Sequence, residues 1–125
     1  MSLAEQIKRA AREIGFDAVG IVAVALLDAE RNRLNDWLGR GFHGTMAWME
    51  REPYKRADPR LLMPAARSVI VVLHNYYTPH EHTAVGKISR YAWGDDYHDI
   101  LRDKLNQLLD VIKTQRPDAN GKICI

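Results

Sequence analysis

The sequence is poor in cysteine and has no long apolar run. Its one cysteine, Cys124, has no partner for an internal disulfide bond, and its five histidines lack neighbours at metal-ligand spacing. The apolar runs at 18–27 and 68–73 are far shorter than the roughly 20 residues that cross a bilayer. We therefore expect a soluble, cytoplasmic protein with no membrane partner and no metal site of its own.

The general catalytic signatures are missing as well. The chain has no glycine-rich phosphate loop, no G-x-G-x-x-G after a strand, no H-E-x-x-H and no serine nucleophile elbow. A formal net charge of +2 permits an RNA partner but does not require one. With 125 residues, of which 46% are hydrophobic and 27% charged, the chain is expected to form one globular domain, and we expect a monomer.

Helices and strands are expected to alternate along the chain. Apolar residues at helical spacing predict a helix over 3–14, with a capping box of Ser2 and Glu5 at its start and Gly15 at its end. A buried strand is expected at 16–24, followed by a second helix that Asp28 can cap. The strongest strand signal is at 68–73, which we expect to be a central, buried strand.

The last third predicts a polar loop and a long helix. The loop covers 76–86, and Asp95 or Asp96 can cap the helix, whose apolar face carries leucines from Leu101 onward. Residues 122–125 are expected to begin another strand. Strands separated by helices predict a mixed α/β fold of the α+β class, with a layered sheet flanked by helices.

Two clusters in the first half of the chain could carry function. The segment 41–49 places Met46 and Trp48 after flexible glycines, as a soft, flat surface that suits a planar cofactor. The alternative is that both are core residues of a short helix. The segment 54–60 holds Lys55, Arg56 and Arg60. Guanidinium groups can bind carboxylate, amide or phosphate oxygens, but an ordinary solvated charge run has the same composition.

A third cluster covers 87–98 and mixes aromatic, basic and acidic side chains at a helix start. Helix amino termini carry unpaired N–H groups that attract anions or polar substituents. The alternative gives Asp95 and Asp96 only a capping role and makes His98 a surface histidine.

Taken in order, five segments resemble the epoxyqueuosine reductases. They are G-F-D-A-V-G-I at 15–21, G-x-x-G-x-M-A-W-M at 41–49, R-A-D-P-R-L-L-M-P-A-A-R-S-V-I at 56–70, N-Y-Y at 75–77 and G-K-I-S-R-Y-A-W-G-D-D-Y-H at 86–98. The resemblance extends from about Phe16 to Ile125. It implies an oxidoreductase of queuosine biosynthesis that reduces epoxyqueuosine to queuosine in a tRNA anticodon stem-loop, using cobalamin and two 4Fe-4S clusters.

The resemblance also implies a domain organisation and a set of contacts. Residues 1–125 would be the amino-terminal cobalamin-binding domain, with a nitroreductase-like sheet, and a ferredoxin-like iron-sulfur domain would follow it. Met46 and Trp48 are weaker candidates for contacts to the cofactor or the edge of the substrate. The stronger candidates are Arg56, Arg90, Tyr91, Asp96, Tyr97 and His98.

The chain departs from the family pattern at two points. Two four-iron clusters need about eight thiolate ligands, and only Cys124 is present. The family's proposed proton donor, an aspartate in a D-T-x-P-like motif, would lie beyond Ile125, so we expect no catalytic residue here and a truncated, inactive fragment. Two alternatives stay open: a non-catalytic module that binds cobalamin or a flavin, and an RNA-binding domain that uses Arg56, Arg60, Arg67 and Arg90.

Overall fold

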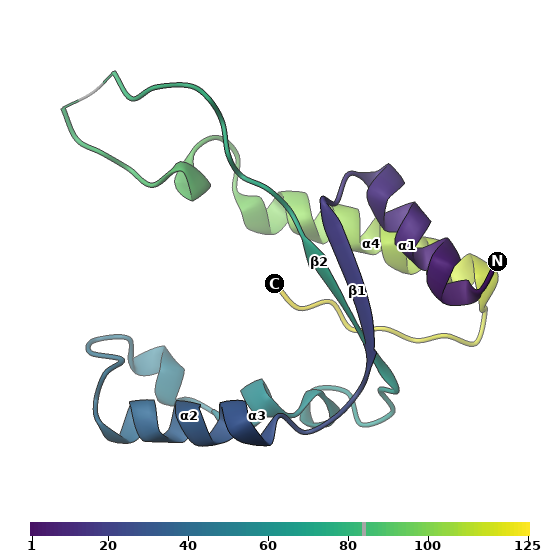
Figure 1. Ribbon diagram of the computed structural model, residues 1–125, viewed down its shortest axis with the longest axis horizontal. Coiled ribbons are helices and arrows are strands. Elements are labelled where there is room, and N and C mark those ends of the chain that lie inside the picture. Colours follow the sequence, from purple (N-terminus) through teal and green to yellow (C-terminus); the bar gives the residue numbers. More distant parts are fainter. Residues whose placement is uncertain (84) are drawn as a thin grey trace. The chain divides into compact units, whose positions relative to one another are not determined.

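The computed structural model describes residues 1–83 and 85–125 (Figure 1). Their contacts divide into two compact units. The first unit consists of 1–21 and 70–125, and the second of 22–69. The expected loop at 76–86 is free of helix and strand over its described residues, and Ala84 lies outside them.

Two antiparallel strands, β1 (Ala18–Ala23) and β2 (Ser68–Leu73), form a two-stranded sheet. The Asp17 N–H, just before β1, donates to the Leu73 carbonyl at the end of β2 over 2.9 Å. Just after β1, the Val24 N–H donates to the Arg67 carbonyl, just before β2, over 3.1 Å. Pairing the start of one strand with the end of the other defines the antiparallel register.

Two helices cover one face of this sheet in the first unit. They are α1 (Leu3–Ile14) and α4 (Tyr97–Gln115), which pack against each other and are seen side by side in Figure 1. Their shared core consists of buried side chains, with partly buried strand residues packed against it. The buried members are Ile7, Ala11, Phe16 and Leu108, and the strand residues are Val19, Ile21, Ile70 and Val72.

The strands are less buried than the sequence predicts. Neither strand contains a buried residue, and Val22, Val71 and Leu73 are more than half exposed, at 58%, 52% and 61%. Successive side chains point to opposite sides of a strand, so Ile70 and Val72 face the helices while Val71 and Leu73 face away. The expectation of two buried strands with a central β2 is therefore wrong for the described residues, because this sheet has two strands and helices cover one face.

Side-chain capping fixes the starts of α1 and α4. The Ser2 hydroxyl accepts from the Glu5 N–H, and a Glu5 carboxylate oxygen accepts from the Ser2 N–H over 2.7 Å, which confirms the capping box. Gly15 ends α1 with a φ of 105°, a conformation that glycine adopts without steric cost. At α4 the cap is Asp96.

The second unit contains α2 (Asp28–Gly39), α3 (Tyr54–Ala57) and the 3₁₀ helices η1 (Ala47–Glu50) and η2 (Pro59–Leu61). Helix α2 confirms the second helix expected after the first strand, but Asp28 is its first helical residue and not its cap. The cap is Leu27, which makes no side-chain capping bond, and Asp28 pairs with Arg31 at 2.7 Å.

The carboxyl-terminal segment corrects another expectation. Residues 122–125 follow α4 without secondary structure, so the strand predicted there is not formed among the described residues. Extended backbone becomes a strand only when a neighbour accepts and donates its hydrogen bonds, and this segment has no such pairing. In the described part of the chain no helix has the length and apolarity needed to span a membrane.

Candidate functional site

The segment between β2 and α4 gathers most of the first unit's aromatic side chains. We call this group the aromatic cluster. It includes the 3₁₀ helix η3 (Arg90–Ala92) and the start of α4. Its members are Tyr76, Tyr77, His82, Arg90, Tyr91, Trp93, Tyr97 and His98.

One row of rings runs through the aromatic cluster. Tyr91 contacts Tyr76 and Tyr97 edge-on, with ring centroids 6.4 and 6.3 Å apart. Tyr97 stacks on His98 with centroids 4.1 Å apart. Because Tyr91 is 53% exposed and Tyr97 is 41% exposed, their ring surfaces are available to a flat or soft ligand.

Arg90 holds a second row together. Its guanidinium lies over the rings of Tyr77 and Trp93, 5.3 and 5.4 Å from their centroids, and donates to the His80 carbonyl over 3.4 Å. Delocalised guanidinium groups stack well on aromatic faces. Arg90 therefore holds the Tyr77 and Trp93 rings in position.

The backbone of Ile88 makes hydrogen bonds to two further aromatic side chains of the cluster. The Trp93 indole N–H donates to the Ile88 carbonyl over 2.9 Å, and the Ile88 N–H donates to His82 Nε2 over 3.0 Å. The His82 and Trp93 rings meet edge-on at 4.7 Å. His82, Tyr76 and Tyr77 were not among the site residues predicted from the sequence, where the N-Y-Y segment is the only signal for the two tyrosines.

Asp96 and His98 form a polar pair at the start of α4. An Asp96 carboxylate oxygen accepts from the His98 backbone N–H at 2.9 Å and lies 2.8 Å from His98 Nδ1. The backbone bond from His98, followed by the bond from its ring, lowers the pKa of Asp96. Since an ionised carboxylate only accepts hydrogen bonds, His98 Nδ1 carries the proton in this contact.

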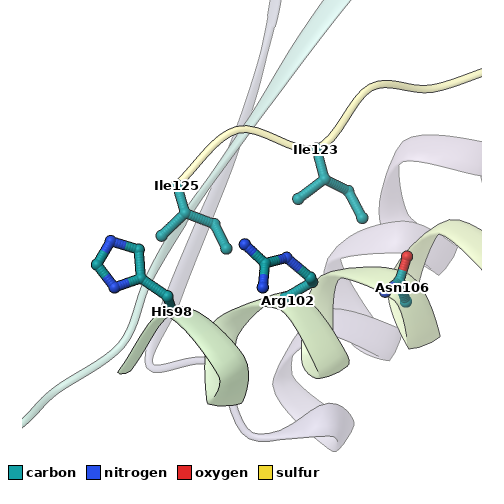
Figure 2. A pocket seen from close by; sticks show the side chains of 5 residues that line it. All are labelled: His98, Arg102, Asn106, Ile123 and Ile125. Atoms are coloured by element: carbon teal, nitrogen blue, oxygen red, sulfur yellow. The ribbon is translucent and has the colours of Figure 1, made fainter. Parts of the chain in front are cut away.

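A shallow cavity of about 260 Å³ lies next to His98 (Figure 2). His98, Arg102 and Asn106 project into it from one face of α4, because they are spaced four residues apart. Ile123 and Ile125 line it from the carboxyl-terminal segment. Arg102 and Asn106 were not among the residues that the sequence singled out, although their four-residue spacing from His98 is visible in it.

Arg56 belongs to the second unit. Its guanidinium lies 5.4 Å from the Trp48 ring centroid and donates to the Trp48 carbonyl over 3.3 Å. Trp48 is 50% exposed and Met46 is 40% exposed, so the interpretation of these two as core residues is wrong. Arg56 and Trp48 together present a cationic, aromatic surface.

The other cations of this segment have partners of their own. Asp58 accepts two bonds from the Arg60 guanidinium, of 2.8 and 2.9 Å, and its pKa is lowered by this side-chain contact. Lys55 pairs with Glu52, which raises the pKa of the lysine. Arg60 and Lys55 thus fit the alternative interpretation of this segment as an ordinary solvated charge run.

Five of the six predicted contact residues lie in or directly beside the aromatic cluster. They are Arg90, Tyr91, Asp96, Tyr97 and His98, whereas Arg56 lies in the other unit. Among the described residues, no group of three or more histidine, cysteine or carboxylate side chains could hold a metal ion. The cluster can offer ring faces, hydrogen-bonding groups, and the imidazoles of His82 and His98.

Comparison with known proteins gives one consistent result. Residues 56–125 match the family described as Epoxyqueuosine reductase QueG, DUF1730. The chain is 43% identical over 123 residues to an epoxyqueuosine reductase of Leadbetterella byssophila, and 44% identical over 110 residues to one of Atelocyanobacterium thalassa. These alignments cover 97% and 84% of this chain but 40% and 35% of the relatives, so the chain spans less than half their length.

Solved structures agree with the sequence relatives. The epoxyqueuosine reductase of Streptococcus thermophilus superimposes with a TM-score of 0.82 at 26% identity, covering 94% of this chain and 33% of that one. An epoxyqueuosine reductase solved with an epoxyqueuosine-modified tRNA-Tyr stem loop gives 0.77 at 30% identity, covering 92% and 32%. The mixed fold of helices and a small sheet is therefore that of these enzymes, and the chain belongs to the epoxyqueuosine reductase family.

Proposed function

We propose that the complete protein is a cobalamin-dependent oxidoreductase that reduces epoxyqueuosine to queuosine in tRNA. The observation that carries this proposal is the family match over 56–125, a range that includes the whole aromatic cluster and Arg56. The chain would supply the amino-terminal, cobalamin-binding domain, with a nitroreductase-like sheet. A tRNA substrate means that the protein would act in the cytoplasm, and we expect it to act as a monomer.

The described residues fit the chemistry of a corrin. A corrin is a broad ring edged by amide side chains, so its site needs flat contacts together with hydrogen-bond donors and acceptors. In the aromatic cluster, Tyr91 and Tyr97 offer exposed ring surface and His98 Nε2 offers a polar contact, while the second oxygen of the adjacent Asp96 can accept from an amide N–H group. When bound, cobalamin supplies a redox-active cobalt.

Each of these residues would have a separate part in holding the cofactor. Tyr91 and Tyr97 would contact the ring, while Asp96 would orient His98 through its 2.8 Å contact with Nδ1. Arg90 would act through its neighbours by holding Tyr77 and Trp93. Arg56, which lies beside Trp48 in the second unit, would donate to an amide oxygen of the cofactor.

The two 4Fe-4S clusters do not fit this chain. They need about eight thiolates, and the sequence has the single, exposed Cys124. Their ligands would belong to a ferredoxin-like domain of the complete protein.

The substrate assignment is supported by the relative that was solved with a modified tRNA stem loop. A genetic complementation tests it. A bacterial strain that lacks its own epoxyqueuosine reductase accumulates epoxyqueuosine in tRNA, and the complete protein should restore queuosine when cobalamin is supplied. Unchanged epoxyqueuosine in a strain that expresses the folded protein would contradict the proposal.

A further inference from the structure

Tyr76 and Tyr77 are the most exposed of the tyrosine, tryptophan and phenylalanine side chains described in the first unit. Their side chains are 65% and 64% exposed, whereas Tyr91 and Tyr97 are 53% and 41% exposed. Leaving two neighbouring large rings in water forgoes the favourable free energy of burying them. Exposed aromatic groups of this kind mark interaction surfaces.

The backbone that carries these tyrosines is anchored. The Asn75 N–H donates to an Asp17 carboxylate oxygen over 2.6 Å, and the Tyr77 N–H donates to the Asn75 side-chain oxygen over 2.9 Å. Asp17 lies next to Phe16, which is 3% exposed and belongs to the core. The two rings therefore project from a fixed base directly after β2.

Each ring is also held from the side by η3. The Tyr76 ring meets Tyr91 edge-on, with an interplanar angle of 74°, and the Arg90 guanidinium lies over the Tyr77 ring. An edge-on neighbour covers at most one face of a ring, and a guanidinium also covers one face only. Both tyrosines are thus oriented in advance and still present flat surface to a partner.

We propose that Tyr76 and Tyr77 form a stacking platform for unpaired nucleobases of the RNA substrate. This inference rests on the proposed function and deepens it by naming residues that bind the RNA. Bases stack on aromatic side chains without regard to sequence, and single-stranded loops expose the faces that paired bases hide. Segment 74–94 also carries Lys87 and Arg90 against one acidic residue, Glu81, a balance that favours a phosphate backbone.

The position of the platform suits the reaction. Tyr76 contacts Tyr91, and Tyr91 contacts Tyr97, which stacks on His98. The platform is therefore continuous with the residues proposed to contact cobalamin. A loop stacked on Tyr76 and Tyr77 would have its neighbouring nucleotide close to that cofactor.

The test uses the complete protein and a fluorescently labelled anticodon stem-loop RNA, with binding read by anisotropy at fixed salt. A Y76L/Y77L variant keeps apolar side chains but removes the rings, and binding should weaken about tenfold or more. Y76F/Y77F keeps the rings and should bind like wild type. Tyr54→Leu makes the same change at a 53% exposed tyrosine of the second unit and should also leave binding unchanged.

Cobalamin absorbance and a fully paired RNA complete the design. The proposal requires that Y76L/Y77L binds cobalamin like wild type and that wild type prefers the stem-loop to the duplex. Equal stem-loop binding by wild type and Y76L/Y77L would overturn the platform while leaving the enzyme assignment intact. A lower melting temperature with unchanged RNA binding would also overturn it, since the rings would then pack against the protein itself. If wild type bound neither RNA, the failure would lie in the proposed function.

Discussion

Leu108→Ala tests the packing of α1 against α4. Leu108 is 2% exposed and shares its core with Ile7, Ala11 and Phe16. The substitution removes three carbon atoms, which corresponds to about 2.4 kcal/mol of transfer free energy, and the remaining cavity adds to that. We expect a total loss of roughly 3 to 4 kcal/mol, a large part of the 5 to 15 kcal/mol typical of a domain.

A urea titration of the chain, followed by helical circular dichroism, measures this loss. Leu108→Met conserves the volume and should cost less than about 1.5 kcal/mol. Leu61→Ala makes the same truncation at a side chain that is 49% exposed and should cost less than about 1 kcal/mol. If Leu108→Ala cost no more than Leu61→Ala, the helices would not pack as described.

Three further predictions concern β2, the Asp96 cap and the cofactor. In the same titration, Ile70→Ala should destabilise the chain by roughly 2 kcal/mol or more, because Ile70 faces the helices. Val71→Ala should cost less than about 1 kcal/mol, because Val71 faces away from them, and equal losses would contradict this assignment of the two faces. Because the pKa of Asp96 is lowered in the folded chain, its ionised form stabilises the fold above the ordinary pKa of aspartate, and this stability is lost as the pH falls through the lowered pKa. Thermal melts at a series of pH values should show this dependence in wild type and not in Asp96→Asn, which keeps a cap. The same pH profile in both proteins would contradict the prediction. An Arg56→Ala, Tyr97→Phe double variant of the complete protein should bind cobalamin more weakly by calorimetry, and equal binding would mean that these residues do not contact it.

The sequence predicted the helices well because their signals are local. The Ser2 and Glu5 capping box and the Gly15 terminus set the limits of α1, and both were read from residues within one turn. At α4 the choice between Asp95 and Asp96 needed the structure, since either side chain can cap. Asp28 was misassigned because α2 begins one residue earlier than a side-chain cap would require.

The strands and the site depend on contacts between distant residues, which spacing alone does not reveal. A run such as 68–73 has the same composition whether one or both faces are covered, so the exposure of Val71 and Leu73 was not predictable. Resemblance to a family pointed to Arg90, Tyr91, Asp96, Tyr97 and His98, but their roles stay predictions. The contacts of Tyr76 with Tyr91 and of Tyr77 with Arg90 join residues that are well separated in the sequence, so the sequence alone did not predict them.

Turnover by purified protein tests the central claim most directly. The complete protein, loaded with cobalamin and with reconstituted iron-sulfur clusters, is given a chemical reductant and an anticodon stem-loop that contains epoxyqueuosine. Mass spectrometry of the digested RNA should show queuosine replacing epoxyqueuosine, with no conversion when cobalamin is omitted or when the 125-residue chain is used alone. Persistence of epoxyqueuosine with the fully loaded protein, or equal conversion without cobalamin, would contradict the account.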